Sequence, residues 1–306
     1  MDIKLIKKQR LSNIALLLAA FIWGTAFVAQ SVGMDYVGPY TFLWIRSFVG
    51  ALALLPVIFV RSKIQKKEKS SEEPLQNDKK TLLMGGLWCG LALCVASNLQ
   101  QVGIQYTSVG NAGFITSMYM LIVPVLSIFL GKKVQKKIWL CIAVAAVGMY
   151  MLSISKEFSV SVGDIIIAGC AFFYAVQIMI VDHFAPKTDA VKLSCLQFVV
   201  TGIITMFMAL IFEEPNIENI LAAAVPILYA GVFSSGIAFT LQIVAQKYAE
   251  PTIATLLMSM ESVFSMLGGI VILQQIPSKR EAIGCMLVFM AVIASQINFN
   301  LKKGKE

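Results

Sequence analysis

The chain is poor in charge and in the residue patterns that enzymes use. Charged residues make up 14% of its 306 residues, against about 25% in an ordinary soluble domain. It holds one histidine, His183, and contains neither a His-Glu-x-x-His zinc motif nor a Walker A phosphate loop nor a Cys-x-x-Cys pair. We therefore expect no enzyme, no catalytic residue, no cofactor and no metal site.

The chain is rich in apolar residues. They make up 58% of the chain, and a bilayer core needs about 20 of them in a row for each spanning helix. Of the charged residues, only Arg46 and Glu261 lie deep inside such stretches. The sequence predicts an all-α polytopic membrane protein with ten transmembrane helices, at 11–32, 40–60, 82–104, 109–130, 137–154, 164–182, 193–212, 222–245, 252–274 and 281–300.

The net charge of +8 follows the predicted topology. With a cytoplasmic N-terminus, 21 of the 25 Lys and Arg residues fall on the cytoplasmic side, as the positive-inside rule requires. A nucleic-acid partner is then unnecessary. We expect a multi-pass protein of the plasma (inner) membrane with both termini cytoplasmic, and a solvated cytoplasmic linker at 61–81.

The two halves of the chain resemble each other. Ala96–Val102 aligns with Ala238–Val244 at an offset of 142, and Ala20–Trp23 aligns with Ala171–Tyr174 at an offset of 151. Five helices per half would make the second copy enter the membrane from the opposite side, an inverted repeat typical of alternating-access transporters. The predicted repeats are 1–156 and 157–306; a duplicated bundle that merely packs well is the alternative.

Glu261 is the strongest candidate for function. An ionised side chain near the middle of a spanning helix costs about 2.5–3.5 kcal/mol on insertion scales, so something must compensate for it. It shares a helix face with Met258 and with small residues, which indicates a face turned toward other helices. It would bind a substrate amine or carry a proton; alternatively, a hydrogen bond to a neighbouring helix fixes packing.

Arg46 lies nearer a helix end. Its long side chain could reach outward to the interface, or it could pair with an anionic substrate group or with Glu261. Its counterpart in the second half is Gln197, which keeps polarity without charge.

Polar stripes mark two repeat-related helices. One comprises Cys94, Asn98, Gln101 and Gln105, and the other comprises Ser235, Phe239, Gln242 and Gln246. Such stripes fit a cavity lined by protein, although hydrogen bonds between helices would also explain them. Trp23 is equivalent to Tyr174, which precedes Gln177, and Asn111 begins a stretch loosened by glycines and Pro124. These positions would line the same cavity or simply form core.

Several ordered segments resemble the EamA-type members of the drug/metabolite transporter superfamily. They are Phe21–Ala29, Phe42–Arg46, Tyr106–Tyr119, Val123–Val125, Ser235–Phe239 and Met260–Val263. Two departures stand out: Ser262 follows Glu261 where the family often has proline, and Gln274–Gln275 replaces a Gly-Glu pair. The resemblance implies movement of amino acids or other small metabolites, mostly export, by alternating access around a central cavity.

We therefore expect a secondary transporter, an exporter of amino acids or similar small metabolites, with proton coupling as one option. Its partners would be a small-molecule solute, the lipid bilayer and protons. The alternative is a membrane accessory or scaffold subunit that transports nothing. The candidate cavity residues are Trp23, Arg46, Asn98, Gln101, Asn111, Tyr119, Tyr174, Gln177, Phe239, Gln242, Met258 and Glu261.

Overall fold

The structure, a computed structural model, describes residues 3–67, 79–153, 161–273 and 278–296. Within these ranges every regular element is helical, and no strand is formed. The centre of the expected linker (68–78), the expected repeat boundary at 156/157, Gln274–Gln275 and the C-terminal tail lie outside the described residues.

Within the described residues, the first half contains six helices and the second contains ten helical segments. In chain order they are α1 (Ile3–Gly33), α2 (Pro39–Lys67), α3 (Lys79–Ile104), α4 (Val109–Ser117), α5 (Tyr119–Phe129) and α6 (Lys136–Ser153), then α7 (Val162–Phe184), η1 (Ala185–Lys187), α8 (Ala190–Phe212), α9 (Ile217–Ala222), α10 (Ala224–Tyr229), η2 (Ala230–Ala238), α11 (Phe239–Gln246), α12 (Pro251–Met258), α13 (Glu261–Leu273) and α14 (Lys279–Gln296).

Seven of the expected spans are helical stretches long and apolar enough to cross a membrane: α1, α2, α3, α4 with α5, α7, α8, and α10 through α11. The other three expected segments are helical where the structure describes them, as α6, α12 with α13, and α14. They fall short of that length and composition test within the described ranges, so a count of ten spans stays a prediction.

Helix ends coincide with residues that can satisfy free backbone groups. Ser108 caps α4, and Ser161 forms a reciprocal capping box with Asp164 at the start of α7. Glu213, at the C-terminal end of α8, caps a different helix: its two carboxylate oxygens accept from the backbone N–H groups of Tyr40 and Thr41 in α2, each at 2.8 Å.

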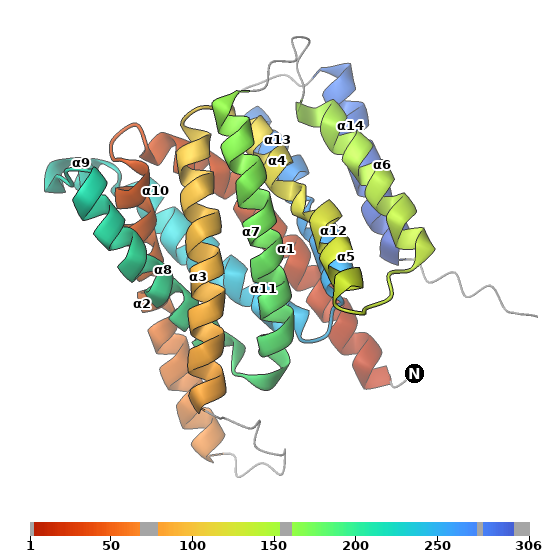
Figure 1. Cartoon of the computed structure of the whole chain (residues 1–306), viewed down its shortest axis with the longest axis horizontal. Coiled ribbons are helices and arrows are strands. Elements are labelled where there is room, and N and C mark those ends of the chain that lie inside the picture. The colour runs from red at the N-terminus through yellow and green to blue at the C-terminus, as the bar shows by residue number, and fades with distance from the viewer. Residues whose placement is uncertain (1–2, 68–78, 154–160, 274–277, 297–306) are drawn as a thin grey trace, which may run out of the picture.

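The two halves interleave in one bundle (Figure 1). α3 packs along α7, and its counterpart in the second half, η2 with α11, packs along α1. α2 packs on α8, and α6 packs on α14 at one edge of the bundle (Figure 1). The contact of α3 with α7 thus corresponds to the contact of η2 and α11 with α1, in which the two halves have exchanged roles. Two structural repeats are expected to show such paired contacts.

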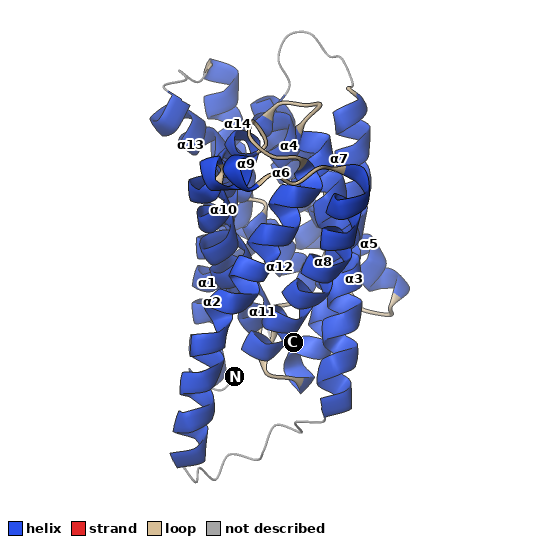
Figure 2. Ribbon diagram, turned by 90° about the vertical axis from the view of Figure 1, so that its left-hand side faces the viewer, coloured by secondary structure: helices blue, strands red, loops and turns tan. Residues whose placement is uncertain are grey.

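Small residues allow close approach at these contacts. A Cβ atom added to Gly86 or Gly90 of α3 would lie 2.6 Å from the Cβ of Leu196 or Val200 in α8. Large apolar side chains such as Phe129, Leu210 and Val225 point outward instead, and most helices run in roughly the same direction, from top to bottom in Figure 2. An apolar outer face along the helices is what a bilayer requires.

Candidate functional site

A central cavity lies between the two halves. It comprises about 460 Å³ of space between protein atoms, part of it open, and both repeats contribute to its wall. The lining residues come from α1, α2, α3, α4, α5, α7, η2, α11, α12 and α13. They are Trp23, Phe27, Gln30, Arg46, Gln100, Thr116, Tyr119, Tyr174, Gln177, Ile178, Ser234, Phe239, Gln242, Met258 and Glu261.

Two interrupted helices meet at this cavity. The first breaks at Met118, between α4 and α5, and the second breaks at Ser259 and Met260, between α12 and α13. These breaks occupy equivalent positions in the repeats, 142 residues apart. Tyr119 is the first residue of α5 and Glu261 the first residue of α13. Interrupted helices near the midplane are a recurrent basis for solute sites in transporters.

Only one carboxylate oxygen of Glu261 accepts hydrogen bonds from the described residues. Its Oε1 accepts hydrogen bonds from the hydroxyls of Ser117, at 2.9 Å, and Tyr119, at 3.0 Å. The side chain is 3% exposed, and no residue in the described ranges donates to its Oε2. The carboxylate is therefore fixed in place with one oxygen left for another donor.

A close helix contact supports this position. A Cβ atom on Gly24 of α1 would lie 2.7 Å from the backbone oxygen of Glu261 and 2.8 Å from the nitrogen of Ser265. Only a residue without a side chain permits this approach. Gly24 thus lets α1 pack against the first turn of α13, where Glu261 lies.

Arg46 is the cavity's cationic residue among those described. It is 3% exposed, and no carboxylate of the described chain lies within 4 Å of its guanidinium nitrogens. Its recorded neighbour is the ring of Phe42, whose centroid lies 5.9 Å from the guanidinium carbon. The expectation that Arg46 reaches outward to the interface is wrong, because the side chain is buried and lines the cavity.

Aromatic rings and amides complete the wall. Trp23 and Phe239 meet edge to face, with ring centroids 4.9 Å apart. The Tyr174 hydroxyl donates to Oε1 of Gln100 at 3.1 Å. The side-chain amide of Gln242 donates to Gln177 at 3.4 Å and to Gln246 at 3.1 Å. These groups are neutral, so Arg46 and Glu261 supply the charge of the described cavity wall.

Nine of the twelve predicted residues line this cavity, and three do not. Asn98 bonds to Thr205 of α8 at 3.0 Å and to the carbonyl of Cys94. Gln101 is fully buried away from the cavity lining, and Asn111 lies on the partly exposed first turn of α4. The predicted cavity stripe of α3 is therefore displaced by one residue: Gln100, not Gln101, lies in the cavity lining.

Six lining residues are not among the twelve candidates. They are Phe27, Gln30, Gln100, Thr116, Ile178 and Ser234. The repeat offset contained the signal for one of them, because Gln100 is the equivalent of Gln242, which was predicted. Ser234 lies in η2, a π-helical segment, and no pattern in the sequence distinguishes this winding from an α-helix.

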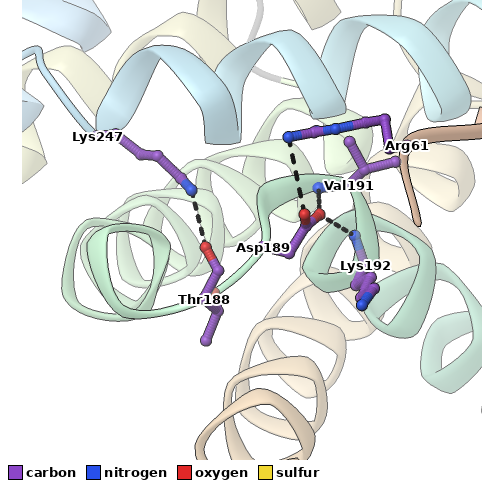
Figure 3. Close-up of polar contacts among 6 residues, drawn as sticks. All are labelled: Arg61, Thr188, Asp189, Val191, Lys192 and Lys247. Carbon is purple, nitrogen blue, oxygen red and sulfur yellow. Dashed lines mark hydrogen bonds and ion pairs between the residues drawn. The ribbon is translucent and has the colours of Figure 1, made fainter. Parts of the chain in front are cut away.

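Charged contacts lie at the end of the bundle that carries Lys247. Arg61 of α2 lies 3.8 Å from Asp189, which also accepts from the backbone nitrogens of Val191 and Lys192 and so caps α8 (Figure 3). The ammonium of Lys247 donates to the carbonyl of Thr188 at 2.8 Å (Figure 3). Burial lowers the pKa of Lys247, and the charge of Asp189 opposes that shift.

A second hollow opens at the same end. It comprises about 1210 Å³ of space between and outside protein atoms, bordered by Lys132, Asp182, Gln246 and Lys247 among others. Lys132 and Asp182 form an ion pair there. Gln246 borders this hollow and bonds to Gln242, which lines the central cavity. A bonded pair of amides thus lies between the two spaces.

The fold and cavity define a multi-pass helical membrane protein built from two repeats around a central site. The chain belongs to the EamA-like transporter family, whose family model matches it twice, over residues 10–154 and 161–295. The chain has 28% identity over 287 residues with an uncharacterized transporter of Archaeoglobus fulgidus, covering 94% of this chain and 86% of that protein. It has 21% identity with the uncharacterized transporter YoaV of Bacillus subtilis, covering 95% of this chain and 98% of that protein.

A solved crystal structure shares the fold. It matches with a TM-score of 0.76 at 17% identity, covering 93% of this chain and 96% of that chain. Family membership agrees with the expectation of a protein that is not an enzyme. In the described residues, no group of three or more His, Cys, Asp or Glu is placed to hold a metal ion.

Proposed function

We propose that the protein is a secondary transporter that exports amino acids or similar small metabolites across the plasma membrane. The observation that carries the proposal is the placement of Glu261. It lies at the break of an interrupted helix, faces the central cavity, and is bonded to the equivalent break of the other repeat. A bundle that serves packing alone would have little use for a buried carboxylate with a free oxygen, because that burial is costly.

Alternating access would move the site between the two sides. The contacts of α1 with η2 and α11 resemble those of α7 with α3. Each repeat could therefore adopt the conformation of the other, which would open the cavity to the opposite side of the membrane. The Lys247 end would be the cytoplasmic end, because it carries most of the positive charge. Solute would pass between the hollow at that end and the cavity once the Gln242–Gln246 contact separates.

Glu261 would also be the site of proton coupling. It is the acidic residue that lines the cavity in the described chain, and the groups around it are the hydroxyls of Ser117, Tyr119 and Ser262, with Arg46 elsewhere on the wall. A carboxylate that binds either a proton or a solute cation couples the two, since occupation by one excludes the other.

The test is counterflow in proteoliposomes with a panel of labelled amino acids and metabolites, with and without a pH gradient. We expect exchange of one class of compound and a response to the gradient that Glu261→Gln removes. The matched control is Glu218→Gln, which makes the same chemical change on an exposed side chain of α9. A full response to the gradient in Glu261→Gln would contradict the coupling role, and no exchange of any compound by folded protein would contradict transport.

A further inference from the structure

Two glycines make the same helix contact in the two repeats. A Cβ atom added to Gly90 of α3 would lie 2.6 Å from the Cβ of Val200 in α8. A Cβ atom added to Gly231 of η2 would lie 2.7 Å from the Cβ of Val49 in α2. The two valines are 151 residues apart, which is the offset of the helices that carry them. Gly90 and Gly231 are therefore equivalent at an offset of 141, an equivalence that only the contacts reveal.

Further along the same helices the offset grows by one. Gln100 of α3 and Gln242 of α11 both line the central cavity, at an offset of 142. The second repeat therefore has one more residue between its glycine and its cavity amide than the first repeat has. An extra residue in an α-helix turns everything after it by about 100°. Both amides nevertheless face the cavity, because the wider π-helical turns of η2 take up the extra residue.

The burial pattern identifies the extra residue as Phe233. If Phe233 is left out, the order of buried and exposed residues from Gly231 to Ile237 is the same as that from Gly90 to Val95. Phe233 itself is 44% exposed, lies outside the cavity lining, and stacks on Tyr229 with ring centroids 5.3 Å apart. Its side chain is therefore not needed at the cavity, while its backbone lengthens the helix.

Contacts at both ends hold η2 in the π-helical winding. At one end, Gly231 lies against α2. At the other end, Nε2 of Gln242 donates to Gln177 of α7 at 3.4 Å. Nε2 of Gln246 donates to the carbonyl oxygen of Ile178, also in α7, at 3.1 Å. Between these two attachments the chain has one residue too many for an α-helix, so the rare π winding persists only while both attachments do.

We propose that η2 is a switch between π-helical and α-helical winding that turns α11 about its axis and separates Gln242 and Gln246 from α7. Once the two amides leave α7, the extra residue enters a regular α-helix, and α11 turns by about 100°. Leu241 then takes the direction that Gln242 has in the π-wound form, because its spacing from Gly231 equals that of Gln100 from its own glycine.

This switch rests on the proposed transport function and specifies the segment that moves in one step of it. Gln242 lines the cavity and Gln246 borders the hollow at the Lys247 end, so turning both away from α7 joins the two spaces. The same turn places an apolar side chain where a polar one was, which weakens the hold of the wall on a polar solute as the path opens. The equivalent helix of the first repeat, α3, is α-helical throughout and has no extra residue.

The first test removes the extra residue. Deletion of Phe233 gives the second repeat the spacing of the first, so α winding alone directs Gln242 into the cavity and the switch has nothing to release. Phe233→Ala is the matched control, because it removes the ring and keeps the residue. Counterflow is measured in proteoliposomes with labelled alanine, threonine, leucine and phenylalanine. We expect exchange to fall at least tenfold in the deletion and to change less than twofold in Phe233→Ala, while both keep the thermal stabilisation that the exchanged amino acid gives the parent.

The second test follows the switch without a known solute. Leu241→Cys and Gln242→Cys are treated in proteoliposomes with a water-soluble methanethiosulfonate reagent, and the parent, in which five of the six native cysteines are buried, gives the background. Leu241 packs against Ala19 and Ile22 of α1 in the π-wound form, so its thiol meets the reagent only after the turn. We expect Leu241→Cys to react at least tenfold more slowly when Phe233 is deleted, and Gln242→Cys to react at similar rates in both chains.

The outcomes separate the switch from transport itself. Unchanged exchange and unchanged Leu241→Cys labelling in a folded deletion variant would overturn the switch and leave transport intact. An equal loss of exchange in Phe233→Ala would assign the effect to the ring and also overturn it. Leu241→Cys labelling no faster than background in the full-length chain overturns the switch whether or not the deletion folds. Labelling as expected without exchange of any compound would instead contradict transport.

Discussion

Tyr119 and Glu261 occupy equivalent positions of the two repeats, and the hydroxyl of the first donates to the carboxylate of the second at 3.0 Å. The breaks of the two interrupted helices are thereby joined directly across the relation that links the halves. Separation of the two breaks would lengthen this bond. The hydrogen bond between Tyr119 and Glu261 therefore opposes separation of the two repeats at their breaks.

The first prediction concerns this bond. Tyr119→Phe removes one of the two donors to Oε1 and keeps the ring, so we expect a loss of about 1.5–3 kcal/mol in the free energy of unfolding, as for hydrogen bonds to charged groups. Ser117→Ala should cost a similar amount. Thermal unfolding in detergent measures both. Additive losses in the double variant would show that the two donors act independently; a smaller combined loss would show that Glu261 relocates after the first.

The second prediction concerns the contact of α1 with α13. Gly24→Ala places a Cβ atom 2.7 Å from the backbone oxygen of Glu261, so one helix must move. We expect a loss of about 1–3 kcal/mol, the usual cost of overpacking, together with a reduced transport rate. Gly169→Ala is the control, since its nearest neighbour lies at 3.7 Å and the change should stabilise α7 by about 0.5–1 kcal/mol. Equal effects of the two changes would contradict close packing at Gly24.

The third prediction concerns the cap that α8 provides for α2. Both oxygens of Glu213 accept backbone N–H groups of the first turn of α2. Glu213→Gln keeps one acceptor and loses the charge that favours a helix N-terminus. We expect a loss of about 0.5–2 kcal/mol, the range for helix caps. Glu214→Gln, an exposed neighbour, should leave the unfolding temperature nearly unchanged, and equal losses would refute the cap.

The fourth prediction is the pH dependence that Lys247 creates. Burial lowers the pKa of Lys247 below the ordinary value of 10.5. Between the folded-state pKa and 10.5 the unfolded chain therefore binds more protons than the folded one, and stability rises with pH in that window. Lys247→Met removes the titratable ammonium group and with it this pH dependence of stability. We expect a flatter profile of unfolding temperature against pH just below 10.5 in the variant, and a profile unchanged from the parent would contradict the shift.

Much of the architecture follows from local sequence properties. Long apolar stretches predict spanning helices because backbone groups in lipid must bond within their own segment, and seven such stretches are present as expected. Helices such as α6 and α14 are short and pack on each other, so their number of residues alone does not establish that they cross.

The cavity was partly predictable for a different reason. Glu261 and Arg46 were recognised because charge in an apolar helix is costly wherever it lies. Asn98 was misassigned because amides serve equally well between helices, and it bonds to Thr205 of α8. Helical periodicity defines a stripe but not the neighbour that it faces, and a change of one residue turns the side chain by about 100°. Contacts between distant segments decide that phase.

The two repeats contribute unequally to the charge of the cavity. The first repeat supplies Arg46 and Tyr119, whereas the second supplies Gln197 and Glu261 at the equivalent positions. A dimer of two first repeats would bring two cations and no carboxylate to the site, and a dimer of two second repeats would oppose two carboxylates. A site with one charge of each sign exists only when unlike halves are combined. The two halves therefore depend on each other for the charge pattern of the cavity, which two identical halves would not form.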